Sequence, residues 1–331
     1  MKNLVLALAA SLALACAPAA LAQVPVPTTP APPAPGPAGP QAAKMSVRVI
    51  GASIDHGTRY FVAGQRIAVA GTISPYVAGE HVTVVLYLGK RVIARKSVAT
   101  KQSGGGGAFR IALAVRKKGN YAVRAYHSAS PGQQKATTRK VAFRAFVGAA
   151  GSGSRGAKVR LLQRSLARMG YVTPRSGVFD AGTSRAVLAY RKVNRMGRDG
   201  FANRAVFLKA LKGRGTFKLR YPRAGKHVEF SWSRQVLVLA RGGRAEKIYH
   251  ASSGKPSTPT VFGTFHFYRK QPGTNAHGMV FSNYFVGGYA IHGYASVPSY
   301  AASHGCIRVP IPNAVGIYRW VKLGNPIFVY R

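Results

Sequence analysis

The stretch Ser303-His304-Gly305-Cys306-Ile307-Arg308, preceded by Ile291-His292-Gly293, decides the fold and the chemistry of the last third of this chain. The chain has two cysteines, and the other one, Cys16, lies in a predicted export leader, so Cys306 has no partner for a disulfide. Imidazole, hydroxyl and guanidinium groups close to a lone thiol are typical of a cysteine nucleophile. The alternative is an inert buried cysteine beside structural histidines. The crowding of His, Ser, Gly and Arg around Cys306 favours the nucleophile.

The N-terminus has the pattern of an export signal. Lys2 precedes an apolar run over residues 4–15, and Ala20-Leu21-Ala22 before Gln23 is a small-x-small cleavage site, which predicts a signal peptide over residues 1–22. The apolar run is too short to span a bilayer. Cys16 leaves a lipoprotein signal open as an alternative, but the cleavage pattern favours ordinary secretion. We therefore expect an extracytoplasmic protein, associated with the cell wall or the periplasm.

The chain is strongly cationic, with 49 Lys and Arg against six Asp and Glu and a formal charge of +43. Residues 44–150 contain 18 basic and two acidic side chains, residues 151–213 contain 14 and two, and residues 214–331 contain 16 and two. A nucleic-acid interface concentrates its charge on one face, so this even spread argues against nucleic acid as a partner. An exported cation of this size is expected to bind anionic cell-wall polymers or an acidic membrane surface. Adaptation to an acidic or salty habitat is the alternative.

A chain of 331 residues has room for two or three domains, and changes in composition predict where they lie. Eight prolines make residues 23–43 a stiff, extended linker. Seven short apolar runs between Met45 and Phe146 alternate with turn residues, which predicts an antiparallel β-sandwich over residues 44–147. This region resembles the immunoglobulin-like (Ig-like) modules of exported wall enzymes. A Gly/Ser linker is expected at residues 148–156, a helical domain at 157–213 and a catalytic domain at 214–331.

The helical domain has local periodicity. Val159, Leu162, Leu166 and Met169 recur at helical spacing, and Gly170 is a natural stop. Further helices are predicted over residues 181–194 and 203–211, which gives a small three-helix bundle. The domain resembles the peptidoglycan-binding three-helix repeat in its order of residues, which is Gly156, Val159, Leu162-Gln163, Leu166, Gly170-Tyr171, Gly177-Val178-Phe179, Thr183, Ala186-Val187, Tyr190, Asp199-Gly200 and Leu211. It departs from the family at Tyr190-Arg191, where Phe-Gln is usual.

The last third returns to strand-forming sequence, with a late helix expected from Asn313 to Leu323 and Asn313 as its cap. Four signatures here resemble the L,D-transpeptidase catalytic domain (YkuD family): the strand at Gln235-Val236-Leu237, the segment Ser252-Ser253-Gly254-Lys255-Pro256 with Thr258-Pro259 and Gly263, Ile291-His292-Gly293, and Ser303 to Val309. The resemblance implies a mostly β fold with one late helix. The interval from His292 to Cys306 is short for the family.

The resemblance also implies roles for individual residues. Cys306 would be the nucleophile and His292 its base, with Gly293 holding the second ring nitrogen through its carbonyl oxygen. Backbone N–H groups at Gly305 and Cys306 would bind the oxyanion, and His304 would support the thiolate, with a structural role as the alternative. Substrate contacts are expected from Ser303, Arg308, Tyr284 and Tyr289. No Asp or Glu follows residue 246, so no carboxylate from this region can orient the histidine.

By the same resemblance, the protein would release D-alanine from peptidoglycan stem tetrapeptides, form a thioester and pass the acyl group to an amine of a neighbouring stem. That reaction builds cross-links in cell-wall biogenesis and supports cell shape. It needs no cofactor and no metal, carbapenem-type β-lactams are expected covalent inhibitors, and a monomer is expected. Two alternatives remain open: a cysteine L,D-carboxypeptidase or hydrolase of wall peptides, and a non-catalytic cell-wall-binding protein.

Overall fold

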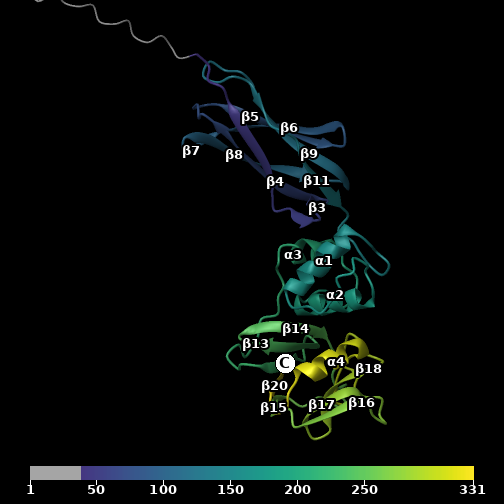
Figure 1. The fold of residues 1–331 in the computed structure, drawn as a ribbon. Helices are drawn as coiled ribbons and strands as arrows, with labels where there is room; N and C mark the ends of the chain where they lie inside the picture. The colour runs from purple at the N-terminus through teal and green to yellow at the C-terminus, as the bar shows by residue number, and fades with distance from the viewer. Residues whose placement is uncertain (1–38) are drawn as a thin grey trace, which may run out of the picture. The chain divides into compact units, whose positions relative to one another are not determined.

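The computed structural model describes residues 39–331, and Pro40–Arg331 belong to one unit (Figure 1). The predicted signal peptide, Cys16 and most of the proline-rich linker lie outside the described residues. At the end of the predicted linker, Gln41 pairs with Gln133. Among the described helices, none has the length and apolar character needed to cross a membrane.

Residues 44–146, here called the two-sheet region, form two mostly antiparallel sheets. The first has the order β1 (Lys44–Ile50), β4 (Gln65–Ser74), β8 (Gly106–Val115) and β7 (Lys101–Ser103). The second has the order β2 (Ser53–Asp55), β3 (Thr58–Val62), β11 (Val141–Phe146), β9 (Gly119–His127), β5 (His81–Leu88) and β6 (Arg91–Ala99), with β10 (Ala136–Thr137) on β9. Their alternating apolar side chains share one core, which includes Val69 and Phe109 of the first sheet and Val84 and Phe143 of the second.

The sequence predicts one strand over residues 46–54, but the structure divides this segment between the two sheets. Gly51 has φ +80°, a left-handed conformation that favours glycine, and the chain turns there from β1 to β2. The region therefore contains more strands than the seven that the sequence predicts, and they are divided between two sheets. The resemblance to immunoglobulin-like modules remains a prediction.

Helices lie where the periodicity predicts them, at α1 (Ala157–Arg168), α2 (Ala181–Val193) and α3 (Arg204–Ala210). Asp180 Oδ1 caps α2 by accepting from the Thr183 N–H at 2.8 Å, and Asn203 Oδ1 caps α3 by accepting from the Val206 N–H at 3.1 Å. Gly170, at φ +92°, ends the turn after α1. We refer to residues 157–210 as the helical region.

The C-terminal region contains two further sheets and the predicted late helix. One sheet has the order β14 (Arg244–His250), β13 (Val236–Arg241), β12 (His227–Ser231), β20 (Pro326–Tyr330) and β15 (Gly263–His266). The other has the order β16 (Arg269–Thr274), β17 (Val280–Val286), β18 (Tyr289–Tyr294) and β19 (Ile307–Pro310). The helix α4 (Ile311–Trp320) starts earlier than predicted, with Pro310 at its N-cap and Pro312 in its first turn, so Asn313 is not its cap.

Strand β13 is buried on both faces, which explains its continuous apolar sequence. Val236, Val238 and Ala240 pack into a core shared with the helical region, whereas Leu237 and Leu239 pack into the core of the C-terminal region. The helical region also extends the edge of this sheet, because the Ile248 N–H donates to the Gly170 carbonyl at 2.8 Å. The helical and C-terminal regions thus share a hydrophobic core.

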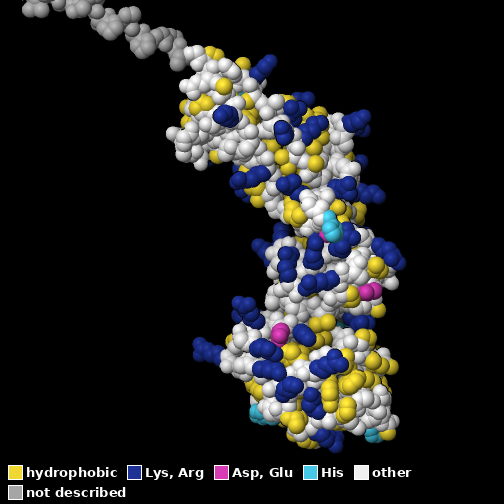
Figure 2. All heavy atoms as spheres, viewed as in Figure 1, with side chains coloured by type: hydrophobic (Ala, Val, Ile, Leu, Met, Phe, Trp, Pro, Cys, Tyr) yellow, Lys and Arg dark blue, Asp and Glu magenta, His cyan; other side chains and the backbone are white. Residues whose placement is uncertain are grey.

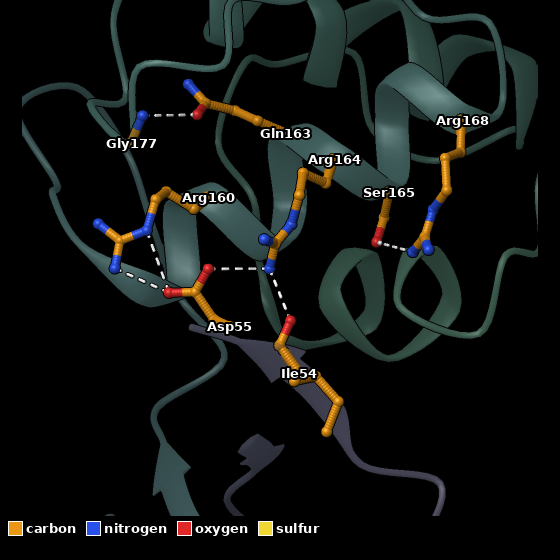
Figure 3. A network of polar contacts seen from close by, with 8 residues as sticks. All are labelled: Ile54, Asp55, Arg160, Gln163, Arg164, Ser165, Arg168 and Gly177. Atoms are coloured by element: carbon orange, nitrogen blue, oxygen red, sulfur yellow. Dashed lines mark hydrogen bonds and ion pairs between the residues drawn. The ribbon is translucent and has the colours of Figure 1, made fainter. Parts of the chain in front are cut away.

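Asp55 joins the two-sheet region to α1 (Figure 3). Its Oδ2 accepts from Arg160 Nε at 3.0 Å and Nη2 at 2.7 Å, and its Oδ1 forms an ion pair with Arg164 Nη2 at 2.9 Å. Arg164 Nη2 also donates to the Ile54 carbonyl at 2.7 Å. Burial alone would raise the pKa of Asp55, but the hydrogen bond and charge of Arg160 and the charge of Arg164 outweigh it and lower the pKa below its ordinary value.

Lys and Arg side chains are distributed over the visible surface of all three regions (Figure 2). Among the described residues, none of the 18 Lys and Arg of residues 44–150 forms an ion pair with a carboxylate, because Asp55 pairs with α1 and Glu80 with His127. The positive charge of this region therefore remains available to an external anion.

We expect Asp55→Asn to destabilise the two-sheet region by about 1–2 kcal/mol at pH 7, because two arginines lose a charged acceptor. The depressed carboxyl pKa means that this contribution is complete above the unfolded-state pKa and is lost as the pH falls through the folded-state pKa. The difference between the variant and the wild type should therefore shrink below pH of about 4. Differential scanning calorimetry measures it. Glu80→Gln is the control, since its nearest cation, His127, lies 3.8 Å away, and an equal loss in both variants would contradict the assignment.

Candidate active site

Parallel pairing of β18 with β19 assembles the candidate site. In this register Ile291 lies opposite Ile307, His292 opposite Arg308 and Tyr294 opposite Pro310. Cys306 immediately precedes β19, so its side chain reaches the start of β18, where the Ala290 N–H donates to Sγ at 3.4 Å. Two segments separated by a loop are thus brought side by side by a backbone ladder.

A cavity of about 350 Å³ opens at this point. Its lining consists of His277, Met279, His292, Tyr294, Ser303, His304, Cys306 and Arg308. The structure therefore brings together the predicted nucleophile and base and three of the other predicted site residues. The lining contains no acidic side chain.

Cys306 is the only free cysteine among the described residues and is partly exposed. Burial of the sulfur raises the pKa of its thiol, against the opposing effects of the Ala290 N–H and the Arg308 charge. The sequence suggested a site that stabilises a thiolate. In the structure the net effect is the reverse, and the resting thiol is favoured over the thiolate.

His292 is 3 % exposed, and its Nδ1 lies 2.9 Å from the Gly293 carbonyl oxygen. An acceptor at this position fixes the proton on Nδ1 and leaves Nε2 as a proton acceptor. Burial lowers the pKa of His292, the Arg308 charge lowers it further, and the Gly293 contact acts in the opposite direction. The imidazole is therefore neutral at pH 7. The Gly293 carbonyl occupies the position that the family resemblance implies.

Ser303 shapes the turn that carries Cys306. Its hydroxyl, which is buried, donates to the Cys306 carbonyl at 2.5 Å and accepts from the Gly305 N–H at 3.1 Å. The Gly305 N–H was expected to face an oxyanion, but here it is engaged within the turn. The hydroxyl of Ser303 is likewise committed to the backbone, although the residue lines the cavity.

Gly305 is required by its conformation and its surroundings. It has φ +123°, and a Cβ at this position would lie 2.5 Å from Tyr289 Cε1. Tyr289 thus packs beneath the turn and does not line the cavity. Tyr284 is also absent from the lining, because it is buried on β17 with its hydroxyl 2.9 Å from Gln271 Oε1.

Arg308 and His304 contribute to the cavity in different ways. The Arg308 guanidinium lies over the Tyr294 ring, 4.1 Å from its centroid, and its positive charge acts to lower the pKa of the Cys306 thiol. His304 is exposed at the mouth of the turn.

The signature at residues 252–259 and the neighbouring Thr260 support the catalytic turn from behind. The Ser303 N–H donates to the Ser253 carbonyl at 2.8 Å, and the Lys255 N–H donates to the Ser303 carbonyl at 2.9 Å. Thr260 Oγ1 donates to the Gly305 carbonyl at 2.5 Å. These conspicuous residues therefore hold the turn in place, and none of them lines the cavity.

Comparison with known proteins assigns two regions of the chain to families. Residues 225–329 match the family described as the L,D-transpeptidase catalytic domain, and residues 155–209 match the putative peptidoglycan binding domain. The crystal structure of the L,D-transpeptidase from Xylanimonas cellulosilytica is 31% identical, with a TM-score of 0.51, and the match covers 55% of this chain and 97% of that chain. The chain belongs to the L,D-transpeptidase family. Its catalytic domain is preceded by a peptidoglycan-binding domain.

Two further solved structures are similar. The L,D-transpeptidase from Stackebrandtia nassauensis is 17% identical with a TM-score of 0.36, covering 55% of this chain and 95% of that chain. The catalytic domain of the Enterococcus faecium L,D-transpeptidase is 25% identical with a TM-score of 0.28, and the match covers 32% of this chain and 97% of that chain. A search of curated proteins gave no match.

Sequence reasoning missed His277 and Met279 in this L,D-transpeptidase domain. Both belong to the turn between β16 and β17, where Asn275 Oδ1 accepts from the backbone N–H of each at 3.0 Å. The pairing of Val280 with Gly293 brings this turn beside His292. Asn275 is a local sequence signal for a turn, but the sequence does not show that this turn packs beside His292.

A buried Lys192 also escaped prediction. Its Nζ lies 2.7 Å from His250 Nδ1 and donates to the carbonyls of Gln235 at 3.1 Å and Ala251 at 3.0 Å. His250 Nε2 lies 2.8 Å from the Val297 carbonyl, in the loop that leads to Cys306. The peptidoglycan-binding domain thus supports the catalytic loop through His250.

We expect alkylation of Cys306 by iodoacetamide to accelerate as the pH rises, with a midpoint above the value of about 8.5 typical of a free cysteine. The reason is that burial raises the thiol pKa, and only the thiolate reacts. Arg308→Gln should move the midpoint higher, because it removes an opposing positive charge. Rates of mass addition measured across pH test this. A midpoint below neutrality would contradict it by indicating a preformed thiolate.

We expect Gly305→Ala to reduce the alkylation rate of Cys306 and to lower the melting temperature, because the new Cβ meets Tyr289 and the backbone conformation is strained. Gly316→Ala provides the control, since a Cβ there has no neighbour within 4 Å. Unchanged reactivity in Gly305→Ala would show that the turn can relax without moving the thiol.

Proposed function

We propose that the protein is an exported, cysteine-dependent L,D-transpeptidase that cross-links peptidoglycan through a thioester on Cys306. The observation that supports this most directly is that Cys306 and His292 line one cavity within a domain of this family. The peptidoglycan-binding domain is consistent with a polymeric substrate. Peptidoglycan lies outside the cytoplasmic membrane, which is consistent with the predicted signal peptide.

In the proposed mechanism the thiol proton moves to His292 as the bond between Sγ and the substrate carbonyl carbon forms. The raised thiol pKa and the lowered imidazole pKa favour a neutral pair at rest. When Sγ attacks the carbonyl carbon of the third stem residue, Nε2 of His292 accepts the thiol proton, and Nδ1 stays bonded to Gly293. The imidazolium then protonates the amine of D-alanine as the C–N bond breaks. A thioester remains on Cys306.

The oxyanion formed in this step needs hydrogen-bond donors close to the sulfur. The Cys306 N–H is the first candidate. The Gly305 N–H can join it only if the Ser303 hydroxyl, its present acceptor, turns away. The Arg308 charge lies in the same cavity and is suited to a substrate carboxylate or to the developing negative charge. An amine of a second stem then displaces Sγ and completes the cross-link.

The proposed partners follow from the same chemistry. A nucleophilic thiol in an open cavity is suited to attack the strained carbonyl of a carbapenem-type β-lactam. The unpaired cations of the two-sheet region are suited to anionic cell-wall polymers, which would hold the enzyme on its substrate.

Incubation with purified disaccharide tetrapeptide tests the proposal. The wild type should release D-alanine and form tetrapeptide–tripeptide dimers, and Cys306→Ala should lose at least about a thousandfold of this rate because no other described side chain in the cavity can form the thioester. Separation of the products by mass gives both quantities. Meropenem should add its mass to the wild type and not to Cys306→Ala.

The products also separate the alternatives. Tripeptide monomer without dimers would identify an L,D-carboxypeptidase, since water would then replace the amine. Equal behaviour of the wild type and Cys306→Ala, with binding to wall sacculi retained, would leave a non-catalytic wall-binding protein. Gly316→Ala serves as the matched control, because it alters the same domain away from the cavity.

A further inference from the structure

A second cavity, of about 370 Å³, adjoins the first. Its lining comes from both domains: Arg185 and Leu188 of α2, His250, Tyr294, Ala295, Val297, Pro310, Ile311 and Pro312. Tyr294 lines both cavities, and its ring stacks on Arg308 of the first. The peptidoglycan-binding domain therefore forms one wall of a space next to the proposed thioester.

The strand register gives the separation of the two cavities. The His292–Arg308 pair lies in the first cavity and the Tyr294–Pro310 pair in the second, and these pairs are two residues apart on the same strands. Residues at i and i+2 point to the same face and are about 7 Å apart. Cys306 lies two residues before Arg308, so about 13 Å of chain separates it from Pro310, and an extended peptide covers this distance with about four residues. A ligand in the second cavity can therefore present an amine to Cys306.

Arg185 gives the second cavity its charge. Its Nε is buried and has no hydrogen-bond acceptor, and its guanidinium forms no ion pair among residues 39–331. No acidic side chain lines the cavity. His250 is neutral, because burial and the Lys192 charge lower its pKa to about 3. An unsatisfied guanidinium donor in such a space is suited to a carboxylate.

The position of Arg185 relative to Cys306 is fixed by packing. Lys192 lies two turns along α2 from Arg185, on the same side of the helix. Its Nζ donates to the carbonyls of Gln235 and Ala251 in the catalytic domain, and the fully buried core beneath it includes Val187 and Val238. These contacts fix helix α2, and with it Arg185, relative to the catalytic domain.

We propose that the second cavity binds the acyl acceptor, a peptide that carries both an amine and a free carboxylate, with Arg185 holding the carboxylate. The inference rests on the proposed function and assigns its second substrate. In the resolving step the acceptor nitrogen attacks the thioester carbonyl, a C–N bond forms and the C–S bond breaks. The sulfur leaves as a thiolate, and His292 transfers the proton lost by the amine to it. The number of protons and electrons is unchanged.

A binding experiment tests the site without requiring turnover. Cys306 is alkylated with N-ethylmaleimide, which fills the first cavity, and the protein is titrated with the stem tetrapeptide and with its C-terminal amide. We expect the acid to bind about tenfold more tightly than the amide, because only the acid can accept from Arg185. Arg185→Gln should abolish this preference. Arg175→Gln, an exposed arginine of the same domain that lines neither cavity, should keep it.

Turnover provides the second readout. With disaccharide tetrapeptide, Arg185→Gln should acylate and release D-alanine within about twofold of the wild-type rate, and its ratio of dimer to tripeptide should fall about tenfold. Arg185→Lys, which keeps the charge, should recover part of that ratio. A comparable melting temperature for both variants excludes misfolding as the cause.

Three results would overturn the inference. Equal binding of acid and amide to the alkylated wild type would show that no carboxylate is recognised. Equal affinity for the peptide-free disaccharide would assign the cavity to the glycan. A fall in acylation as large as the fall in transfer would place Arg185 on the donor side. If the wild type releases no D-alanine, the proposed function fails, and the titration still decides whether the second cavity binds a carboxylate.

Discussion

Parallel pairing between β18 and β19 is the constraint on which the rest of the site depends. Parallel neighbours need a connection of about a dozen residues, and here the connection is the catalytic loop itself. The ladder places His292 opposite Arg308 and leaves Cys306 at the mouth of the loop. A shift of one residue would send the His292 side chain to the opposite face of the sheet. The chemistry of the domain therefore relies on a backbone register more than on any contact between side chains.

The catalytic loop is held through its carbonyl groups. Val297 lies against His250, Tyr300 accepts from Ser252, and Ser303 accepts from Lys255. The signature that follows β14 therefore has a structural role. Its residues form hydrogen bonds with the backbone of an irregular loop that does not pair with any strand. It also explains why the helical region packs so closely on β13 and β14. Lys192 stabilises His250, and His250 orients the loop.

The large positive charge has little influence on the thiol. Burial raises the pKa of Cys306 even though Arg308 lies in the same cavity. Exposed charges more than about 10 Å away are screened by salt, so the spread of cations over the surface acts on external polymers and on solubility. The pKa of the thiol is set locally, by burial of the sulfur, the Ala290 N–H and the Arg308 charge.

The sequence by itself determined the elements whose signals are local: the positions of three helices between residues 157 and 211, the apolar strand at 236–240, and the cysteine and histidine of the site. Their patterns depend on neighbours a few residues away. Tertiary structure alone decided that Tyr289 packs beneath the turn, that His277 joins the cavity and that Arg185 borders a second one. Each of these facts depends on which surfaces meet across long stretches of chain, and periodicity in a single segment carries no information about its distant partners.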